Sequence, residues 1–199
     1  DTETPQVIIA SFGRFGQIVA RVLRANKIRF TAIENSIEQV EISRRFGNRI
    51  YYGDPTRSDL LRAAHIDKVE LFIVATDDPE ANIRTARLVR RMYPQLKVFA
   101  RARNRQHAFR LMDLGALIER ETFHSSLVLS RRVLEALGMS SELAAQRVAA
   151  FRDFDEKLLA EQHLIYDDEA AIMQNSREAQ RDLDNLFEAD IAGEKESQT

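Results

Sequence analysis

A glycine turn near the amino terminus, followed by an acidic residue, is the pattern in this sequence that could carry chemistry. Gly13 and Gly16 come directly after a predicted strand, Val7–Ser11, and Glu34 closes the next apolar run. This order of strand, glycine turn, helix, strand and acid is typical of a dinucleotide-binding βαβ unit. In such a unit the turn and the helix start bind phosphate, while the acid binds the ribose hydroxyls and repels a 2′-phosphate. The sequence therefore predicts a nucleotide crevice that disfavours NADP.

One position departs from that pattern, because Ser11 stands where the first glycine is expected. The turn can accommodate serine, but the motif is weaker for it. The alternative interpretation is an α/β domain that has kept its glycine turn and binds no nucleotide. Arg14, inside the turn, is placed to meet a phosphate, and a cation at a helix start is favourable only when an anion is present.

A polar segment, Gly53–Thr56, follows the third predicted strand. The carboxyl ends of parallel strands lie at one edge of the sheet, so this segment should reach the same crevice. Two interpretations stay open for Asp54. It can bind an adenine amino group or a ribose, with Thr56 capping the next helix, or it can form an Asx-type turn that leads into that helix.

The fourth and fifth predicted strands also end in candidate residues. Ala75 is small enough for an adenosine to lie over the sheet edge, and Asp77 or Asp78 is expected to cap a helix. The fifth strand opens a run of basic residues that either binds a carboxylate-bearing ligand or forms a solvated, salt-bridged face. These residues are Arg101, Arg103, Arg105, Arg110 and Arg120.

Composition excludes several classes of function. The chain has 199 residues, a formal net charge of -2 and no cysteine, which rules out disulfides, thiolate metal sites and a cysteine nucleophile. No global basic field favours nucleic acid, and no apolar run approaches the roughly 20 residues that span a bilayer. The four histidines show no metal-ligand spacing, and no hydrolase or phosphate-loop motif occurs. We therefore predict no catalytic residues and no metal. Because the chain begins at Asp1 and not at methionine, we expect that it was either processed or cut from a larger protein.

The predicted elements divide the chain into three parts. Residues 5–119 alternate strand and helix, which predicts a Rossmann-like, doubly wound parallel sheet of about six strands. Residues 120–190 form a helical extension without strands, and residues 191–199 are predicted to be a disordered tail. The predicted strands are Val7–Ser11, Arg29–Glu34, Arg49–Tyr52, Leu71–Thr76, Lys97–Ala102 and Ala116–Ile118. The predicted helices are Phe15–Ala25, Ile37–Phe46, Ser58–Ala64, Pro79–Tyr93, Arg105–Leu114, Glu121–Leu137, Glu142–His163 and Asp168–Ala189.

Several segments together resemble the carboxyl-terminal cytoplasmic domain of Kef, the bacterial glutathione-gated potassium efflux system. This domain is of the potassium-conductance-regulating type, called KTN or RCK. The resemblance covers about residues 5–165. It is carried by Ile8–Gln17, Phe46–Gly47, Tyr52–Arg57, Asp77–Pro79, Ala100–Arg103 and Glu119–Phe123.

The resemblance implies a homodimeric regulator attached to a membrane antiporter domain of the same polypeptide, on the cytoplasmic side of the bacterial inner membrane. It implies that AMP or NAD(H) occupies the crevice, that glutathione keeps the pore closed and that glutathione S-conjugates open it. A quinone-reductase-like ancillary subunit often docks on such domains. No nucleic-acid partner is implied.

The same resemblance assigns residues to two ligands. Glutathione contacts are implied at Arg21, Phe46, Arg120 and Asp155, where the family usually has asparagine at the last position. An ionised aspartate cannot donate a hydrogen bond and would repel a glutathione carboxylate. Nucleotide contacts are implied at Phe12, Gly13, Arg14, Phe15, Gly16, Glu34, Asn35, Gly53, Asp54, Thr56, Ala75, Thr76 and Arg101.

Two other functions share parts of this pattern. A small NAD-dependent oxidoreductase would use the same crevice, but the helical extension offers no acid–base pair for a substrate beside the nicotinamide. A nucleotide-sensing regulator of another potassium channel or transporter would share the fold without depending on glutathione.

Overall fold

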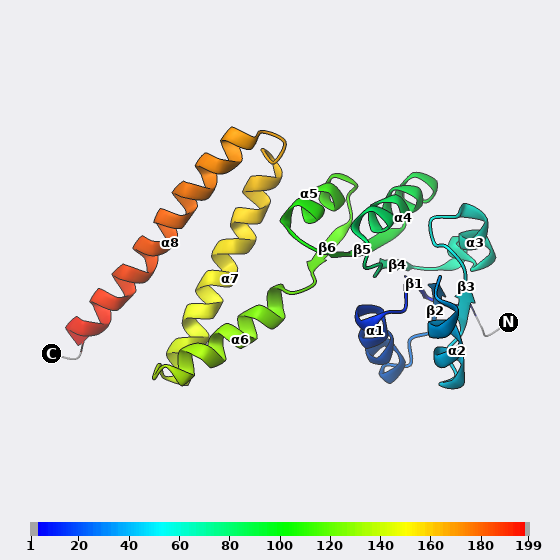
Figure 1. Cartoon of the computed structure of the whole chain (residues 1–199), viewed down its shortest axis with the longest axis horizontal. Coiled ribbons are helices and arrows are strands. Elements are labelled where there is room, and N and C mark those ends of the chain that lie inside the picture. The colour runs from blue at the N-terminus through cyan, green and yellow to red at the C-terminus, as the bar shows by residue number, and fades with distance from the viewer. Residues whose placement is uncertain (1–3, 198–199) are drawn as a thin grey trace. The chain divides into compact units, whose positions relative to one another are not determined.

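The computed structural model describes residues 4–197, which divide into two compact units. The first unit ends at Glu121, and the second begins at Thr122. The first is built around a sheet, and the described residues of the second form helices and the turns between them (Figure 1). For residues 194–197 only the helical backbone is described.

The first unit is organised by one parallel sheet of six strands in the order β3-β2-β1-β4-β5-β6. From the central pair, β1 and β4, the chain proceeds towards opposite edges of the sheet. In sheets of this kind ligands bind outside the carboxyl ends of the strands, at this switch point. The predicted doubly wound sheet is therefore confirmed. Its strands are β1 (Val7–Ala10), β2 (Phe30–Glu34), β3 (Ile50–Tyr52), β4 (Leu71–Val74), β5 (Lys97–Ala102) and β6 (Leu117–Arg120).

Helices cover both faces of this sheet (Figure 1). The first face carries α1 (Arg14–Ala25) and α2 (Ile37–Arg45). The other face carries α3 (Ser58–Ala63), α4 (Pro79–Met92) and α5 (Arg105–Asp113), and a short 3-10 turn, η1 (Ile66–Lys68), precedes β4. Right-handed crossovers require this division, because the chain moves one way from β1 to β3 and the other way from β3 to β6.

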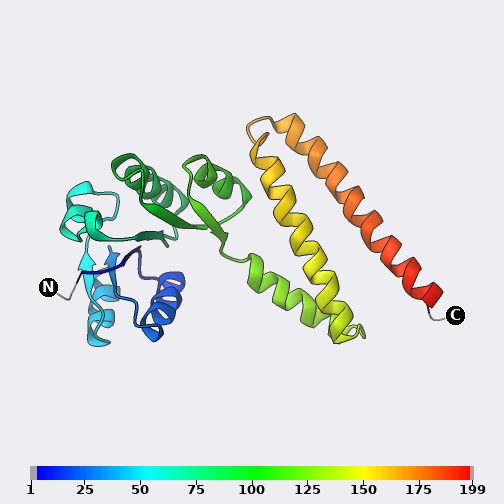
Figure 2. The same cartoon turned by 180° about the vertical axis from the view of Figure 1, so that it is seen from behind.

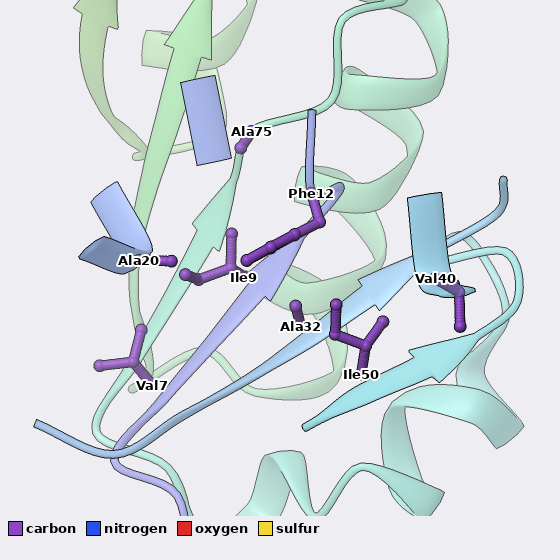
Figure 3. Packing of buried hydrophobic residues seen from close by; sticks show 8 residues of the cluster. All are labelled: Val7, Ile9, Phe12, Ala20, Ala32, Val40, Ile50 and Ala75. Atoms are coloured by element: carbon purple, nitrogen blue, oxygen red, sulfur yellow. The ribbon is translucent and has the colours of Figure 1, made fainter. Parts of the chain in front are cut away.

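The core between the sheet and its first helical layer holds α1 against β1 (Figure 3). All four residues of β1 are buried, as expected for a central strand that is covered on both faces. One side of the strand contributes to a cluster that also includes residues of both helices and of the turn between β1 and α1. The cluster consists of Val7, Ile9, Phe12, Ala20, Ala32, Val40, Ile50 and Ala75.

The second unit consists of α6 (Phe123–Ala136), α7 (Ser141–His163) and α8 (Glu169–Ser197). In both views α7 and α8 lie side by side as an antiparallel hairpin (Figure 2). Two buried polar residues of α7 hold α8. Arg147 donates to the carbonyl of Phe187 and pairs with Asp190, each at 3.3 Å, and the Gln162 amide donates to Asn175 and Ser176.

Most predicted element boundaries agree with the structure to within one or two residues, and the main correction concerns the end of the chain. The sequence predicts a disordered tail from residue 191, but α8 continues to Ser197. Gly193 disfavours a helix by only about 1 kcal/mol, which is too little to end one that is otherwise continuous. Residues 198–199 lie outside the described part of the chain. Among the helices described, none is both long enough and apolar enough to cross a bilayer.

Candidate functional site

The turn between β1 and α1 has an unusual backbone at its first residue. Ser11 adopts a positive φ of 75°. A residue with a Cβ atom is strained in the left-handed region by roughly 1–2 kcal/mol, which explains why the first position of such turns favours glycine. The Ser11 N–H donates to the carbonyl of Ile33 at 2.7 Å, so the strained residue is fixed to the neighbouring strand.

Glu34, at the end of β2, holds this turn in place. Its side chain is buried, and its Oε2 accepts the Phe12 N–H at 2.7 Å and the Ser11 hydroxyl at 3.3 Å. Its Oε1 accepts the N–H of Ser36 at 2.8 Å, at the start of α2. A carboxylate has about four acceptor positions, so about one is left for a ribose hydroxyl. Glu34 therefore positions the turn first, and its role as a ribose ligand rests on the remaining position.

Two glycines of the turn serve different purposes. A Cβ atom on Gly16 would lie 2.5 Å from the carbonyl oxygen of Ser11 and 3.5 Å from the Cβ of Ala75. Gly16 is therefore required for α1 to pack on the sheet, as the sequence predicted. A Cβ atom on Gly13 would meet nothing closer than the Ser11 Oγ, at 4.0 Å. The fold does not need a glycine at position 13, but close approach of a ligand would.

The amino terminus of α1 is open to an anion. Gly13 is its N-cap residue and provides no side-chain hydrogen bond, and the first turn contains no acidic residue. The first N–H groups of a helix have no partner within the helix and carry the positive end of its dipole. Arg14, the first residue of α1, is exposed beside them. This end of the helix offers both N–H donors and a cation to a phosphate.

The segment after β3 forms the Asx-type turn that was one of the two interpretations of Asp54. Its Oδ1 accepts the N–H of Thr56 at 2.9 Å, and the side chain is exposed. Thr56 does not cap α3, since the N-cap residue is Arg57 and no side chain bonds there. Gly53 donates its N–H to the carbonyl of Glu34 at 2.9 Å, and exposed Asn35 follows the same strand end. The structure thus brings this segment to the end of β2, beside the turn that Glu34 holds.

The ends of β4 and β5 are joined by an asparagine that the sequence motifs did not single out. Asn82 of α4 is fully buried, and its Nδ2 donates to the carbonyls of Thr76 and Arg101, each at 3.0 Å. The Thr76 Oγ1 and the Asn82 Oδ1 are both buried and have no hydrogen-bond partner among the described residues. Ala75 is buried against Gly16, and Asp78 caps α4 by accepting the Ala81 N–H at 2.7 Å. The expected cap is confirmed.

Arg101 is used within the chain, although it was expected to contact the nucleotide. It is almost buried, donates to the carbonyl of Ala75 at 3.3 Å and to Asp77 at 3.0 Å, and pairs with Glu121. Its guanidinium also lies 5.4 Å from the ring centre of Phe15. The basic run therefore consists in part of salt bridges, since Arg103 also pairs with Asp77. Arg101 positions the residues of the crevice and has little capacity left for a phosphate.

The side chain of Phe12 also lies elsewhere than expected for a nucleotide contact. It is buried in the core (Figure 3). It stacks on Phe30, with ring centres 6.3 Å apart. Its contribution to the site is the N–H group that Glu34 accepts. Phe15, in the first turn of α1, is half-buried against that core.

The four residues assigned to glutathione lie on separate elements. Arg21 is exposed on α1, and Phe46 follows α2 with 73% of its surface exposed. Arg120 ends β6, and Asp155 lies on α7, in the second unit. Because most of its surface is exposed, the Phe46 side chain contributes little to the core and is available to contact a ligand or a partner.

One of the four histidines, His107, is built into the fold of the first unit. His107 is buried, and its Nδ1 accepts the Arg103 N–H at 2.9 Å, while burial lowers the pKa of the ring. The neutral ring is therefore part of the start of α5, as expected for a structural histidine. Within residues 4–193, no three metal-ligating side chains come together.

Comparison with known proteins identifies relatives for both units. Residues 7–119 match the family model of the TrkA-N domain, and residues 125–199 match that of the potassium efflux system KefB C-terminal domain. A solved Kef carboxyl-terminal domain of Shewanella denitrificans, in an AMP-bound form, is 37% identical. That match covers 80% of this chain and 98% of the Shewanella chain, with a TM-score of 0.74.

Two further solved structures share the first unit's fold. GsuK bound to ADP is 28% identical over 59% of this chain and 31% of its own, with a TM-score of 0.53. The TrkA-N domain of the inner membrane protein ybaL from Escherichia coli is 20% identical, with a TM-score of 0.59. That match covers 69% of this chain and 99% of the ybaL domain, and at this identity it bears on the fold alone.

The two glycines of the turn give a first prediction. Gly16→Ala should lower the free energy of unfolding by about 1–3 kcal/mol, because the new methyl group meets a backbone carbonyl. Gly13→Ala should change it by less than about 1 kcal/mol, since only the preference at the helix cap is affected. Urea denaturation measures both. Equal destabilisation by the two substitutions would contradict the separate roles given to these glycines.

Ser11 gives a second prediction, from a pair of variants that both lack the hydroxyl group. Ser11→Gly should be more stable than Ser11→Ala by about 1 kcal/mol, because only alanine keeps the Cβ atom that strains a positive φ. Thermal unfolding followed by circular dichroism would rank them. If the alanine variant were the more stable, the assignment of a left-handed backbone conformation to Ser11 would be wrong.

Proposed function

The chain belongs to the TrkA-N family and to the carboxyl-terminal domains of Kef-type potassium efflux systems, and we propose that it is the ligand-sensing domain that gates such a system. In this proposal it binds a nucleotide, and it responds to glutathione as an inhibitor and to glutathione S-conjugates as activators. It acts as a regulator and not as an enzyme. The observation that carries the proposal is the open, glycine-flanked start of α1 beside the Glu34 carboxylate.

The nucleotide is proposed to be AMP or NAD(H). The start of α1 offers N–H groups to a phosphate, and position 13 leaves space for its close approach. Glu34 has about one acceptor position for a ribose hydroxyl, and its charge would repel the 2′-phosphate of NADP. The unpaired Thr76 Oγ1 and Asn82 Oδ1 at the neighbouring strand ends leave further polar capacity. The AMP-bound form of the Shewanella domain supports the assignment.

Glutathione is proposed to bind through Arg21, Phe46, Arg120 and Asp155. Glutathione carries two carboxylates and one ammonium group, and a guanidinium can bind a carboxylate through two parallel hydrogen bonds. Asp155 cannot donate to a carboxylate as the asparagine of related domains can, but it can accept from the ammonium group. The chain contains no cysteine, so sensing would be by reversible binding and not by a mixed disulfide.

Phe46 provides a means of telling free glutathione from its adducts. Its ring is largely exposed just after α2. A bulky S-substituent would displace the ring, whereas free glutathione has no such group. The two ligands would then favour different arrangements of the protein, which is what a shift in population requires.

The helical extension, residues 120–190, is proposed to mediate a homodimer. No residue of α6 is buried within the chain. Val128, Leu129, Val133 and Leu137 each expose about half or more of their surface. Three of these residues lie on α6 and Leu137 is its C-cap residue. Apolar side chains at this density mark an interaction surface, and a second copy of the same helix is the simplest complement.

The whole assembly is proposed to lie at the cytoplasmic face of the bacterial inner membrane. The domain would follow a membrane antiporter domain of the same polypeptide, since both Kef matches are to carboxyl-terminal domains. A quinone-reductase-like ancillary subunit is a further proposed partner.

The alternative function, a small NAD-dependent oxidoreductase, predicts turnover of NADH. A spectrophotometric assay for NADH turnover would detect it.

Titration calorimetry with glutathione, and then with a bulky S-substituted glutathione, tests the proposed function. Both ligands should bind saturably, and Arg120→Ala should weaken both by about tenfold to a hundredfold, because it removes a charge-assisted pair with a carboxylate. Arg120→Lys keeps the positive charge but not the two parallel N–H donors of the guanidinium. Its affinity for both ligands should therefore lie between those of the unaltered chain and of Arg120→Ala.

Arg84→Ala, at an exposed position of α4, is the matched control and should bind as the unaltered chain does. Binding of AMP without binding of either glutathione compound would reduce the function to nucleotide sensing in another kind of potassium regulator. It would also make Asp155 the first residue to change.

Phe46→Ala in the complete efflux protein should reduce discrimination between the two ligands. Potassium efflux from cells should still be held closed by glutathione, but activation by an electrophile should fall by about tenfold, because no ring is left to displace. Phe99→Ala, which removes another partly exposed phenylalanine, serves as the control. Full activation in the Phe46 variant would exclude the steric switch.

A further inference from the structure

A cavity of about 400 Å³ opens at the amino-terminal edge of the sheet, away from the nucleotide crevice. Its wall is formed by the end of α1, by the residues that lead into β2 and by the turn before β3. Pro5, which precedes β1, also lines it. The crevice lies at the carboxyl ends of the same strands, and a strand of five residues separates the two edges by roughly 15 Å.

The lining of this cavity is strongly cationic. Arg24, Lys27, Arg29 and Arg49 all contribute to it, and no acidic residue is among the described residues that line it. Arg29 and Arg49 also take part in other interactions, so the charge offered to a ligand is that of Arg24 and Lys27. All four side chains are exposed. Basic residues outnumber acidic ones in residues 1–121, and the reverse holds in residues 122–199, so the positive charge belongs to the unit that contains this cavity.

Two details indicate that the cavity suits a compact polar ligand. The Arg24 guanidinium lies 5.9 Å from the ring centre of Phe30, a contact that orients the cation without neutralising its charge. Asn48 lines the cavity, and its buried Oδ1 has no hydrogen-bond partner among the described residues. An amide can accept from a hydroxyl group or, when turned over, donate to an anion.

We propose that this cavity binds a phosphate group, and specifically the phosphate headgroup of an anionic phospholipid. The guanidinium of Arg24 and the ammonium of Lys27 at one pocket suit a phosphate better than any neutral ligand. The lipid source follows from where the chain enters the domain. Pro5 lines the cavity, and in the proposed function, on which this inference rests, the residues before it lead to the membrane domain. Basic residues near an anionic membrane each contribute to binding at its surface.

The test uses the purified 199-residue chain and vesicles of phosphatidylcholine with or without phosphatidylglycerol. The chain should float with the anionic vesicles only. Arg24→Gln combined with Lys27→Gln should weaken this binding by about 30-fold, following the usual contribution of two basic residues at an anionic surface. Arg29 and Arg49 are left unchanged, because they take part in other interactions.

The matched control combines Lys68→Gln with Arg84→Gln, which removes the same charge from exposed positions outside the cavity. An equal loss in both double variants would overturn the proposal, since binding would then depend on overall charge. If free glycerol phosphate at micromolar concentration prevented flotation, the lipid assignment would be wrong, and the ligand of the cavity would be a soluble phosphate compound. No flotation at all would also overturn it, and AMP titration of the same samples separates that result from failure of the proposed function.

Discussion

The first unit depends on the buried carboxylate of Glu34. It lies at the end of β2, yet it accepts hydrogen bonds from the turn between β1 and α1 and from the start of α2. Without it, the buried N–H of Phe12 and the hydroxyl group of Ser11 would lose their acceptor, and an unmade hydrogen bond in a buried position costs about 1–3 kcal/mol. One side chain thus fixes the amino-terminal end of α1 relative to β2 and α2.

The other half of the crevice is held by a second polar network of a different kind. Arg101 joins the end of β4 to the ring of Phe15 in α1, and it pairs with Glu121, the last residue of the first unit. Asn82 links the ends of β4 and β5, because its side-chain amide donates to the carbonyls of Thr76 and Arg101. Arg101, which bonds to the residues after β4, therefore also bonds directly to Glu121, where the chain leaves this unit.

The sequence predicted the parts of this structure that follow from local pattern. Alternating strands and helices fixed the sheet, and the glycine spacing located the turn, because Gly16 has a packing role that no other residue could fill. The side-chain networks could not be predicted in the same way. Phe12 and Arg101 were predicted to contact a nucleotide, but their side chains contact other residues of the protein, and Asn82 belongs to no motif. The end of α8 was missed because low apolar content does not by itself stop a long helix.

Calorimetric titration of the chain with AMP, NADH and NADPH, repeated on Glu34→Gln, tests the central claim most directly. Saturable binding of AMP or NADH is expected, with NADPH weaker by about tenfold or more, because its 2′-phosphate would face the carboxylate. In Glu34→Gln the preference against NADPH should shrink, and binding of all three should weaken as the turn loosens. Absence of nucleotide binding, or equal affinity for NADH and NADPH in the unaltered chain, would contradict the account.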